Sequence, residues 1–469
     1  MKYCKYKIFS TRVNVQALFS NFKNDRLPFL LESGKGVGDR GRYSFFSSDP
    51  FLVLRVKDGR CFQEKDGVIT ACDSAPLQTL RELLQRYALV GKLQHDIPLL
   101  CGAVGFFSYD FGFQLEKMKR RHVPDRDIPD FVFGFYDWVV CVDHLEKKVI
   151  VFSSGFPEKG MVRRKRASNR LKQVLKKLEN DSLRDSSAGI GVVCGKKDLV
   201  SNFSKAAYMK AVEEVKEYIS CGDIYQVNLS QRFKTRLAID DWALYRRLSK
   251  RFPVSFSGFF SDGPMSIISA SPEMFLSYEN QMVLSRPMKG TRPRTVDRAF
   301  NRISKQQLID SAKEKAELLM IVDLERNDLG RVCEYGSVRV NRFRRIESYR
   351  GVFQAIAEVK GKLYRKKDRL DLIKACFPGG SVTGAPKIAA MEVIERLEPH
   401  PRGAYTGSLG FLSFHDTLEF NILIRSFVKY NDEISFHVGG GIVTDSNPRA
   451  EYEETLVKAK ALKEALFGI

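Results

Sequence analysis

The sequence predicts a globular protein of mixed helices and strands. Hydrophobic residues make up 43% and aromatic residues 11% of its 469 residues, which is enough to bury a large core. Short apolar runs bounded by turn residues alternate with longer amphipathic runs, the patterns of strands and helices. No apolar run approaches the roughly 18 residues that a membrane span needs, and the first residues lack the apolar stretch of a secretory signal. We therefore expect no membrane association.

Charge and cysteine usage narrow the function classes. The formal net charge of +21 raises the question of a nucleic-acid partner. The basic residues are spread along the chain and no base-reading motif occurs, so we expect no nucleic acid. A basic nucleic-acid-binding protein stays an alternative, which a strongly salt-dependent affinity would support. Nine cysteines without a C-x-x-C pair argue against a disulfide framework or zinc site and favour a reducing cytoplasm.

Residues 1–153 are predicted to form a strand-rich N-terminal subdomain. One amphipathic helix is expected at 77–87. Gly34, Gly36, Gly38 and Gly41 indicate a turn rather than a dinucleotide-binding loop, because no helix follows them. The strands are expected at 29–33, 42–46, 51–56, 102–109, 131–142 and 148–153.

The next two regions differ in composition. Residues 154–200 are basic and then polar, and we interpret them as a linker segment with one helix at most. Residues 201–469 return to alternating helices and strands, beginning with a helix that Ser204 caps and that runs to residue 220. Strands are expected at 226–233, 254–260 and 265–270.

A lone lysine lies in the segment SRPMKGTRPR, residues 285–294. Pro287 and Pro293 restrict the backbone, and Gly290 lets a ligand approach the main chain beside Lys289. The segment predicts an active-site loop, in which burial or neighbouring cations lower the lysine pKa. The cations would be Arg286, Arg292 and Arg294. A basic surface loop is the alternative reading.

Two helical segments far apart in sequence each carry a pair of glutamates three residues apart. Glu314 and Glu317 form one pair, and Glu451 and Glu454 form the other. Because residues at this spacing share a helix face, the four carboxylates could converge on one Mg²⁺, which prefers oxygen ligands. The alternative is a solvated face on each helix, with Glu454 and Lys458 forming an ordinary i,i+4 pair.

Two glycine-rich segments suggest carboxylate sites. FPGGSVTGAPK, residues 377–387, leads into a helix whose free N–H groups would face an anion. It lacks the Lys then Ser or Thr of a phosphate-binding P-loop, so a carboxylate is the expected guest and a tight turn is the alternative. Arg425, in a predicted strand, and a loop at Gly439, Gly440 and Gly441 could form the second site.

Six segments give the strongest functional signal. They are SPEMF (271–275), RPMKGTRPR (286–294), LLMIVDLERNDLGRV (318–332), FPGGSVTGAPK (377–387), YTGSLGFLSF (405–414) and GGGIVTDSNPRAEYEET (439–455). In order and spacing they resemble the chorismate-using enzymes, most closely the aminodeoxychorismate synthase component I branch. The resemblance implies an α+β fold, an αββα layered sandwich with antiparallel sheets, and a chorismate-binding catalytic core at 201–469.

The resemblance also implies roles for individual residues. Glu317 and Glu454 match Mg²⁺ ligands, with Glu314 and Glu451 acting through water, and Glu273 matches an acid that assists departure of the ring hydroxyl. Lys289 matches a lysine that attacks the ring, where anthranilate synthases usually have alanine. Gln226 replaces the water-activating lysine of isochorismate and salicylate synthases, and Gln354 replaces a histidine linked to pyruvate elimination. The positions that match holders of the chorismate carboxylates are Thr291, Ser381, Tyr405, Arg425, Gly440 and Lys458.

The implied ligands and partners follow. Ser33, Tyr43 and Ser44 are expected to line an amino-acid pocket, by resemblance for tryptophan. No cysteine lies in a G-x-C-x-G nucleophile turn, so ammonia derived from glutamine would come from a separate amidotransferase subunit. The expected activity is amination of chorismate to 4-amino-4-deoxychorismate, for p-aminobenzoate and folate synthesis. Anthranilate synthase component I is the enzymatic alternative.

Overall fold

The computed structural model describes most of the chain. It covers residues 3–10, 14–34, 41–91, 97–179, 199–236, 239–349 and 351–468. The centre of the predicted glycine turn, at 35–40, and the second half of the predicted linker, at 180–198, lie outside the described residues.

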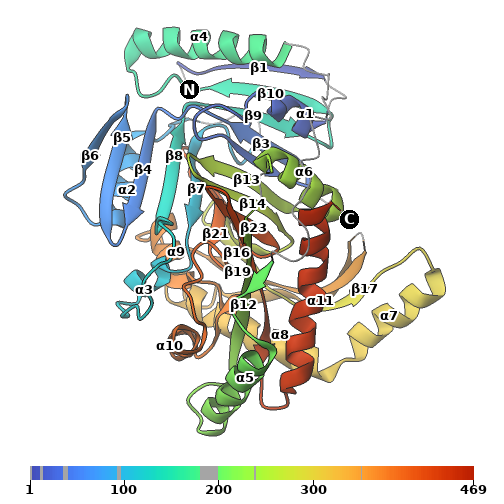
Figure 1. The fold of residues 1–469 in the computed structure, drawn as a ribbon. Coiled ribbons are helices and arrows are strands. Elements are labelled where there is room, and N and C mark those ends of the chain that lie inside the picture. The colour runs from blue at the N-terminus through green and yellow to red at the C-terminus, as the bar shows by residue number, and fades with distance from the viewer. Residues whose placement is uncertain are drawn as a thin grey trace.

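The strands form two sheets of twelve strands each, in which neighbouring strands are antiparallel (Figure 1). Sheet A has the order β1-β10-β9-β3-β2-β13-β14-β23-β24-β12-β11, with β20 also paired to β12. Its strands are β1 (Lys5–Ser10), β2 (Phe29–Glu32), β3 (Tyr43–Ser47), β9 (Trp138–Asp143), β10 (Lys148–Ser153), β11 (Val200–Ser201), β12 (Gln226–Arg236), β13 (Phe256–Asp262), β14 (Met265–Ser271), β20 (Gly384–Ala385), β23 (Ser426–Tyr430) and β24 (Glu433–Ile442).

Sheet B has the order β17-β19-β16-β15-β22-β21-β7-β8-β4-β5-β6, with β18 also paired to β19. Its strands are β4 (Leu52–Lys57), β5 (Arg60–Lys65), β6 (Val68–Ala71), β7 (Gly102–Phe107), β8 (Phe131–Tyr136), β15 (Met274–Glu279), β16 (Met282–Arg286), β17 (Met288–Pro293), β18 (Arg339–Ser348), β19 (Val352–Lys362), β21 (Ser408–Ser413) and β22 (Leu418–Asn421). Each sheet takes strands from residues 1–153 and from residues 201–469.

Helices cover the outer faces of the two sheets (Figure 1). Sheet A packs against α4, α5, α6, α10 and α11, and sheet B against α2, α7 and α8. The predicted α+β layered fold with antiparallel sheets is confirmed. The helices are α1 (Val15–Ser20), α2 (Pro76–Arg86), α3 (Phe111–Leu115), α4 (Gly160–Glu179), α5 (Lys205–Ser220), α6 (Asp241–Arg251), α7 (Arg298–Asp310), α8 (Ala312–Gly330), α9 (Arg369–Cys376), the 3₁₀ turn η3 (Gly380–Val382), α10 (Lys387–Leu397) and α11 (Pro448–Phe467).

The main core fills the space between the sheets, because each strand turns alternate apolar side chains inward. Phe45 of sheet A meets Phe411 of sheet B with ring centroids 5.9 Å apart. A second core lies under α6 and α11, where Trp242 packs on Phe259 at 5.7 Å. Burial of apolar surface in both cores is the main stabilising term.

The run 131–142 was expected to be one buried strand, and this prediction is wrong. It forms β8 in sheet B and β9 in sheet A, and the chain crosses between the sheets at Asp137. Asp137 is fully buried, with oxygens 3.4 Å from Arg166 and 3.6 Å from Arg170 of α4. A buried carboxylate needs such partners, so the crossing point is held by α4 of the basic segment.

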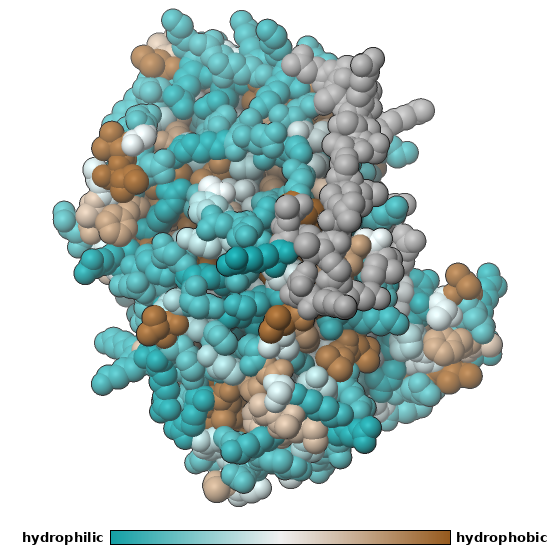
Figure 2. Space-filling model, in the orientation of Figure 1, coloured by the Kyte–Doolittle hydropathy of each residue, from teal (hydrophilic) through white to brown (hydrophobic). Residues whose placement is uncertain are grey.

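The basic segment is thus attached to the folded body as far as residue 179. Helix α4 packs on β1 and β10 and buries Ala167 and Val174. Of the helices that the structure describes, none is both long and apolar enough to cross a membrane. Figure 2 shows one largely hydrophilic face, with apolar side chains gathered on the projecting helix α7.

Candidate functional site

The segment 285–294, predicted as a loop, is mostly strand. Strand β16 ends at Arg286, Pro287 breaks the run, and β17 carries Lys289 alongside β19. Gly290 has φ +84° where the β17 register shifts, and an added Cβ there would lie 2.9 Å from Leu308 and 3.1 Å from Glu314. The glycine therefore lets β17 approach α8 closely.

Lys289 lies beneath the turn η3, where its Nζ donates to the Ser381 carbonyl oxygen at 3.1 Å. Burial is the main cause that lowers its pKa, and the Lys458 charge acts in the same direction, against Glu317 and Glu273. Of the two expected causes of the lowered pKa, burial is the main one, and the charges that act on the lysine come from Lys458, Glu317 and Glu273 rather than from the arginines. Arg286 pairs with Glu347 at 2.6 Å and Arg292 with Glu314 at 2.6 Å, so their charges are already compensated.

Glu273 follows β14 and lies almost completely buried on the other side of Ser381. The Ser381 hydroxyl donates to Glu273 Oε1 at 2.6 Å. Burial raises the pKa of Glu273 to about 7, although this hydrogen bond and the Lys289 charge oppose the rise. Ser381 therefore connects a carboxyl that titrates near neutral pH with a lysine that deprotonates more easily than usual.

Gln226 at the start of β12 is completely buried, and neither its amide nitrogen nor its amide oxygen finds a partner in the described chain. A Cβ on Gly441 would lie 2.7 Å from Gln226 Nε2 and 3.7 Å from Lys289 Nζ. Gln226 and Lys289 thus flank one small space beside Gly441. A buried amide without protein partners indicates a polar guest.

The four predicted metal-ligating carboxylates are carried by α8 and α11, and the charge of Glu451 on α11 acts on Glu317 on α8. Burial is the main cause that raises the pKa of Glu317, and the charges of Glu314 and Glu451 raise it further. Burial also raises the pKa of Glu451, and the charge of Glu454 adds to that rise. Gly440 leaves the gap open, since its added Cβ would lie 3.3 Å from Glu451 Oε2 and 3.8 Å from Glu454 Oε1.

These carboxylates suit a hard cation in their chemistry. Glu314 Oε2 is buried and, within the described residues, lacks a hydrogen-bond partner. Oxygen ligands and mutual repulsion both fit Mg²⁺. The described residues hold no ready-made group of three ligands, so the glutamate side chains would have to rotate around an ion.

The remaining predicted substrate contacts differ in their exposure and in the residues that they contact. Thr291 is exposed in β17 opposite Gln354, and Lys458 pairs with Glu454 at 2.7 Å. Tyr405 is buried, and its ring stacks on His437 with the ring centroids 4.6 Å apart. The charge of Arg425 lowers the pKa of Glu273, so the arginine lies near that carboxyl group.

Two local predictions at the second carboxylate site are wrong. Arg425 precedes β23 with φ +51° instead of lying in a strand, and Gly439, Gly440 and Gly441 belong to β24 instead of a loop. The continuous pairing of β24 with β12 overrides the low strand preference of glycine. Bare glycines here let Gln226 and the carboxylates approach the strand.

Two buried charged residues next to the site were not singled out from the sequence. Glu325 of α8 and Arg402 after α10 each contact the residues around Ser381. In sequence they look like ordinary helix and turn charges. Their burial, at 3% and 2% exposed, is the signal, and it needs the structure.

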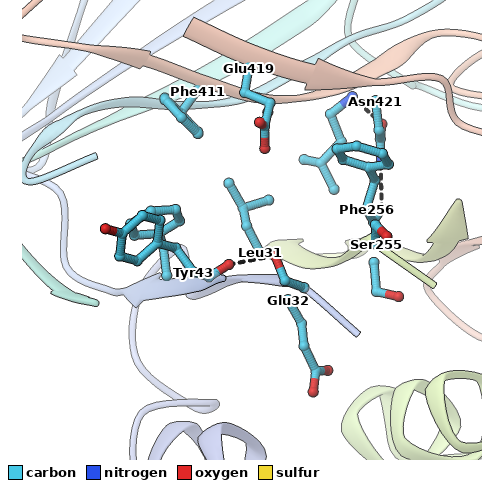
Figure 3. Close-up of a pocket in the computed structure, with 13 residues that line it drawn as sticks. Leu31, Glu32, Tyr43, Ser255, Phe256, Phe411, Glu419 and Asn421 are labelled. Atoms are coloured by element: carbon cyan, nitrogen blue, oxygen red, sulfur yellow. Dashed lines mark hydrogen bonds between the residues drawn. The ribbon is translucent and has the colours of Figure 1, made fainter. Parts of the chain in front are cut away.

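The predicted amino-acid pocket is a cavity of about 30 Å³ between the two sheets (Figure 3). Ser33 and Tyr43 line it from sheet A, and Phe411, Glu419 and Asn421 from sheet B. The Ser44 hydroxyl is instead engaged with the Ser33 N–H and with His144 Nε2, at 2.7 Å. The cavity has room for about one water, so a larger guest requires side-chain movement.

Comparison with known proteins identifies the family. The model of the chorismate binding enzymes matches residues 28–464. The chain belongs to the chorismate-binding enzyme family. All six recognised segments lie within the matched residues.

Relatives with two different functions match this chain at similar identity. Aminodeoxychorismate synthase component 1 from Bacillus subtilis is 34% identical over 93% of this chain and 91% of its own. Anthranilate synthase component 1 from Thermus thermophilus is 37% identical over 93% and 92%. The structure of anthranilate synthase component I from Streptococcus pneumoniae superposes with a TM-score of 0.78 at 30% identity, covering 90% of this chain and 92% of that one.

Proposed function

We propose that this protein is aminodeoxychorismate synthase component I, which aminates chorismate to 4-amino-4-deoxychorismate. The observation that carries the proposal is Lys289, a half-buried lysine with a lowered pKa that lies between Ser381 and Gln226. A lysine amine becomes a nucleophile when burial favours its neutral form. Similar identity to both functional groups of relatives leaves this residue to distinguish them.

The reaction begins with the Lys289 amine attacking the ring carbon beside the carboxylate-bearing one. The ring double bonds shift and the hydroxyl across the ring leaves. Glu273, which is protonated in a large fraction of molecules at neutral pH because its pKa is raised to about 7, gives its proton to the departing oxygen, which leaves as water. The bound lysine nitrogen now carries a positive charge.

Ammonia then bonds to the carbon that held the hydroxyl, and the double bonds shift back. Lys289 leaves as a neutral amine, and the proton released by the added nitrogen returns to Glu273. Gln226 offers amide groups to the incoming ammonia in place of a lysine that would activate water. Net, chorismate and ammonia give aminodeoxychorismate and water.

The charged residues around the lysine would hold the substrate. Arg425 and Lys458 can bind carboxylates, as can the Gly440 backbone, and Thr291 and Tyr405 stay proposed contacts. Glu317 and Glu454 would bind Mg²⁺ directly, with Glu314 and Glu451 reaching it through water. A bound Mg²⁺ would neutralise the ring carboxylate and draw electrons toward it.

The products would come from chorismate and an ammonia supply. We propose a separate glutamine amidotransferase subunit as the source, in keeping with relatives named as component 1. Gln354, buried opposite Thr291, stands where the family often has histidine, and this fits an enzyme that keeps the enolpyruvyl group.

The direct test is mass spectrometry of the product formed from chorismate, Mg²⁺ and ammonium, with ammonium omitted as the control. Aminodeoxychorismate without pyruvate is the expected result. Anthranilate together with stoichiometric pyruvate would refute the proposal and establish the alternative, anthranilate synthase component I.

A further inference from the structure

Among the hydrogen bonds of the described chain, Ser381 is the one residue that contacts the side chains of both proposed catalytic residues, Lys289 and Glu273. Its hydroxyl donates to Glu273 at 2.6 Å, and its carbonyl accepts from Lys289 at 3.1 Å. The turn η3 that carries it is only three residues long. So short a turn cannot fix a side chain alone, and its neighbours must supply the rigidity.

Two buried charges hold the residues immediately before and after Ser381. Glu325 Oε1 accepts from the Gly380 N–H at 3.3 Å, and Arg402 Nη1 donates to the Val382 carbonyl at 2.9 Å. The other carboxylate oxygen of Glu325, Oε2, accepts from the hydroxyl of Ser285 in β16 at 2.9 Å. A Cβ on Gly380 would lie 2.6 Å from Leu324 and 3.3 Å from Glu325, so the glycine is what allows this contact.

Arg402 binds more than the turn. It pairs with Glu398 at 2.6 Å and donates to the Asn228 carbonyl at 2.6 Å, two residues along β12 from Gln226. Its guanidinium also lies 5.6 Å from the Tyr405 ring centroid. The arginine fork thus ties the turn to the strand of Gln226 and to the ring of Tyr405.

We infer that Glu325 and Arg402 are positioning residues that clamp the turn η3 from both sides and so align Ser381 between Glu273 and Lys289. Neither residue touches substrate in this scheme. The inference rests on the proposed catalytic roles of Glu273 and Lys289, but it does not depend on which aminated product forms.

The pH profile gives a readout that a merely structural role would not move. The charges that act on Glu273 are those of Lys289 and Arg425, and the Ser381 hydrogen bond adds to them in lowering its pKa. Loss of that hydrogen bond raises the Glu273 pKa, so the protonated acid persists to higher pH. The basic limb of the pH profile, where kcat/KM falls as Glu273 loses its proton, should then move to higher pH.

The experiment measures kcat/KM for chorismate consumption against pH, at constant free ammonia, in folded variants checked by circular dichroism. Ser381→Ala and Glu325→Ala should each move the basic limb upward by about half a pH unit or more. Their double variant should move it no further than Ser381→Ala alone. Glu325→Gln keeps an acceptor for Gly380 and should restore the wild-type limb.

Ser285→Ala is the matched control, since it removes the other contact of Glu325 and leaves the clamp. It should keep the limb and change kcat/KM less than about twofold. The inference is overturned if folded Glu325→Ala keeps the wild-type limb, if its shift adds to that of Ser381→Ala, or if Ser285→Ala shifts as far. Because chorismate consumption is measured, product identity does not affect these outcomes.

Discussion

The buried carboxyl of Glu273 should make the stability of the protein depend on pH in a specific way. Its pKa is about 7 in the folded protein against 4.5 as the ordinary value, a difference of about 2.5 units, or about 3 kcal/mol at 1.36 kcal/mol per unit. A raised folded pKa gives stability that is complete below pH 4.5 and lost as pH rises through 7. The ionised side chain is therefore a liability in alkaline solution.

Glu273→Gln removes this titration while keeping shape and hydrogen-bonding capacity. The free energy of unfolding of the variant, relative to the wild type, should rise by up to about 3 kcal/mol between pH 4 and pH 8.5. The same variant should lose activity because it cannot protonate the leaving oxygen. Stability gained with activity lost is the pattern expected of a strained catalytic group.

Urea denaturation of both proteins at the two pH values measures the difference, and titrating groups that do not interact with Glu273 cancel between them. Glu453→Gln, which changes an exposed carboxylate on α11, is the control and should show no such gain. A Glu273→Gln effect that is the same at both pH values would refute the reasoning, because Glu273 would then ionise as it does in water.

Three further predictions concern ligands. Glu317→Gln and Glu454→Gln should each lower activity about 100-fold or more and weaken Mg²⁺ binding in calorimetry, with Glu453→Gln unchanged; normal turnover in both variants would make the two helices merely solvated faces. Tryptophan at 100 times its Kd should stabilise the folded protein by about 2.7 kcal/mol and so raise the thermal midpoint of unfolding. Tyr43→Ala should reduce this rise, and an unchanged midpoint in the wild type counts against the pocket. The chain alone should use ammonium salts but not glutamine, and glutamine-dependent turnover by the pure chain would sink the proposed need for an amidotransferase subunit.

The sequence predicts those parts of the fold that depend on local patterns. Ser204 was expected to cap a helix, and its hydroxyl accepts from the Ala207 N–H at 3.1 Å. The layered arrangement of the sheets was predicted from the resemblance of the six segments to a known family, since the alternation of apolar and polar residues does not say which sheet a strand joins. The split of 131–142 at Asp137 depends on Arg166 and Arg170, which are distant in sequence.

The sequence predicted which residues form the candidate site, but it did not predict which groups surround each of them. Lys289, Glu273 and Ser381 were all named from sequence, but only the structure shows that the serine bridges the other two. The charge around the lysine was assigned to arginines because they are its sequence neighbours. In space Arg286 and Arg292 pair with glutamates, and burial, the other expected cause, is the main one that lowers the lysine pKa.

A lysine-bound reaction has one direct observable, the covalent adduct. Mixing the protein with chorismate and Mg²⁺ in the absence of ammonia, followed by rapid quenching and peptide mass spectrometry, should add the mass of chorismate less water to the peptide that contains Lys289. Lys289→Ala should lose the adduct and the production of aminodeoxychorismate, whereas Lys315→Ala, which changes an exposed lysine of α8, should keep both. An unmodified Lys289, together with full aminodeoxychorismate production by Lys289→Ala, would contradict the account and leave the lysine as a charge that positions substrate.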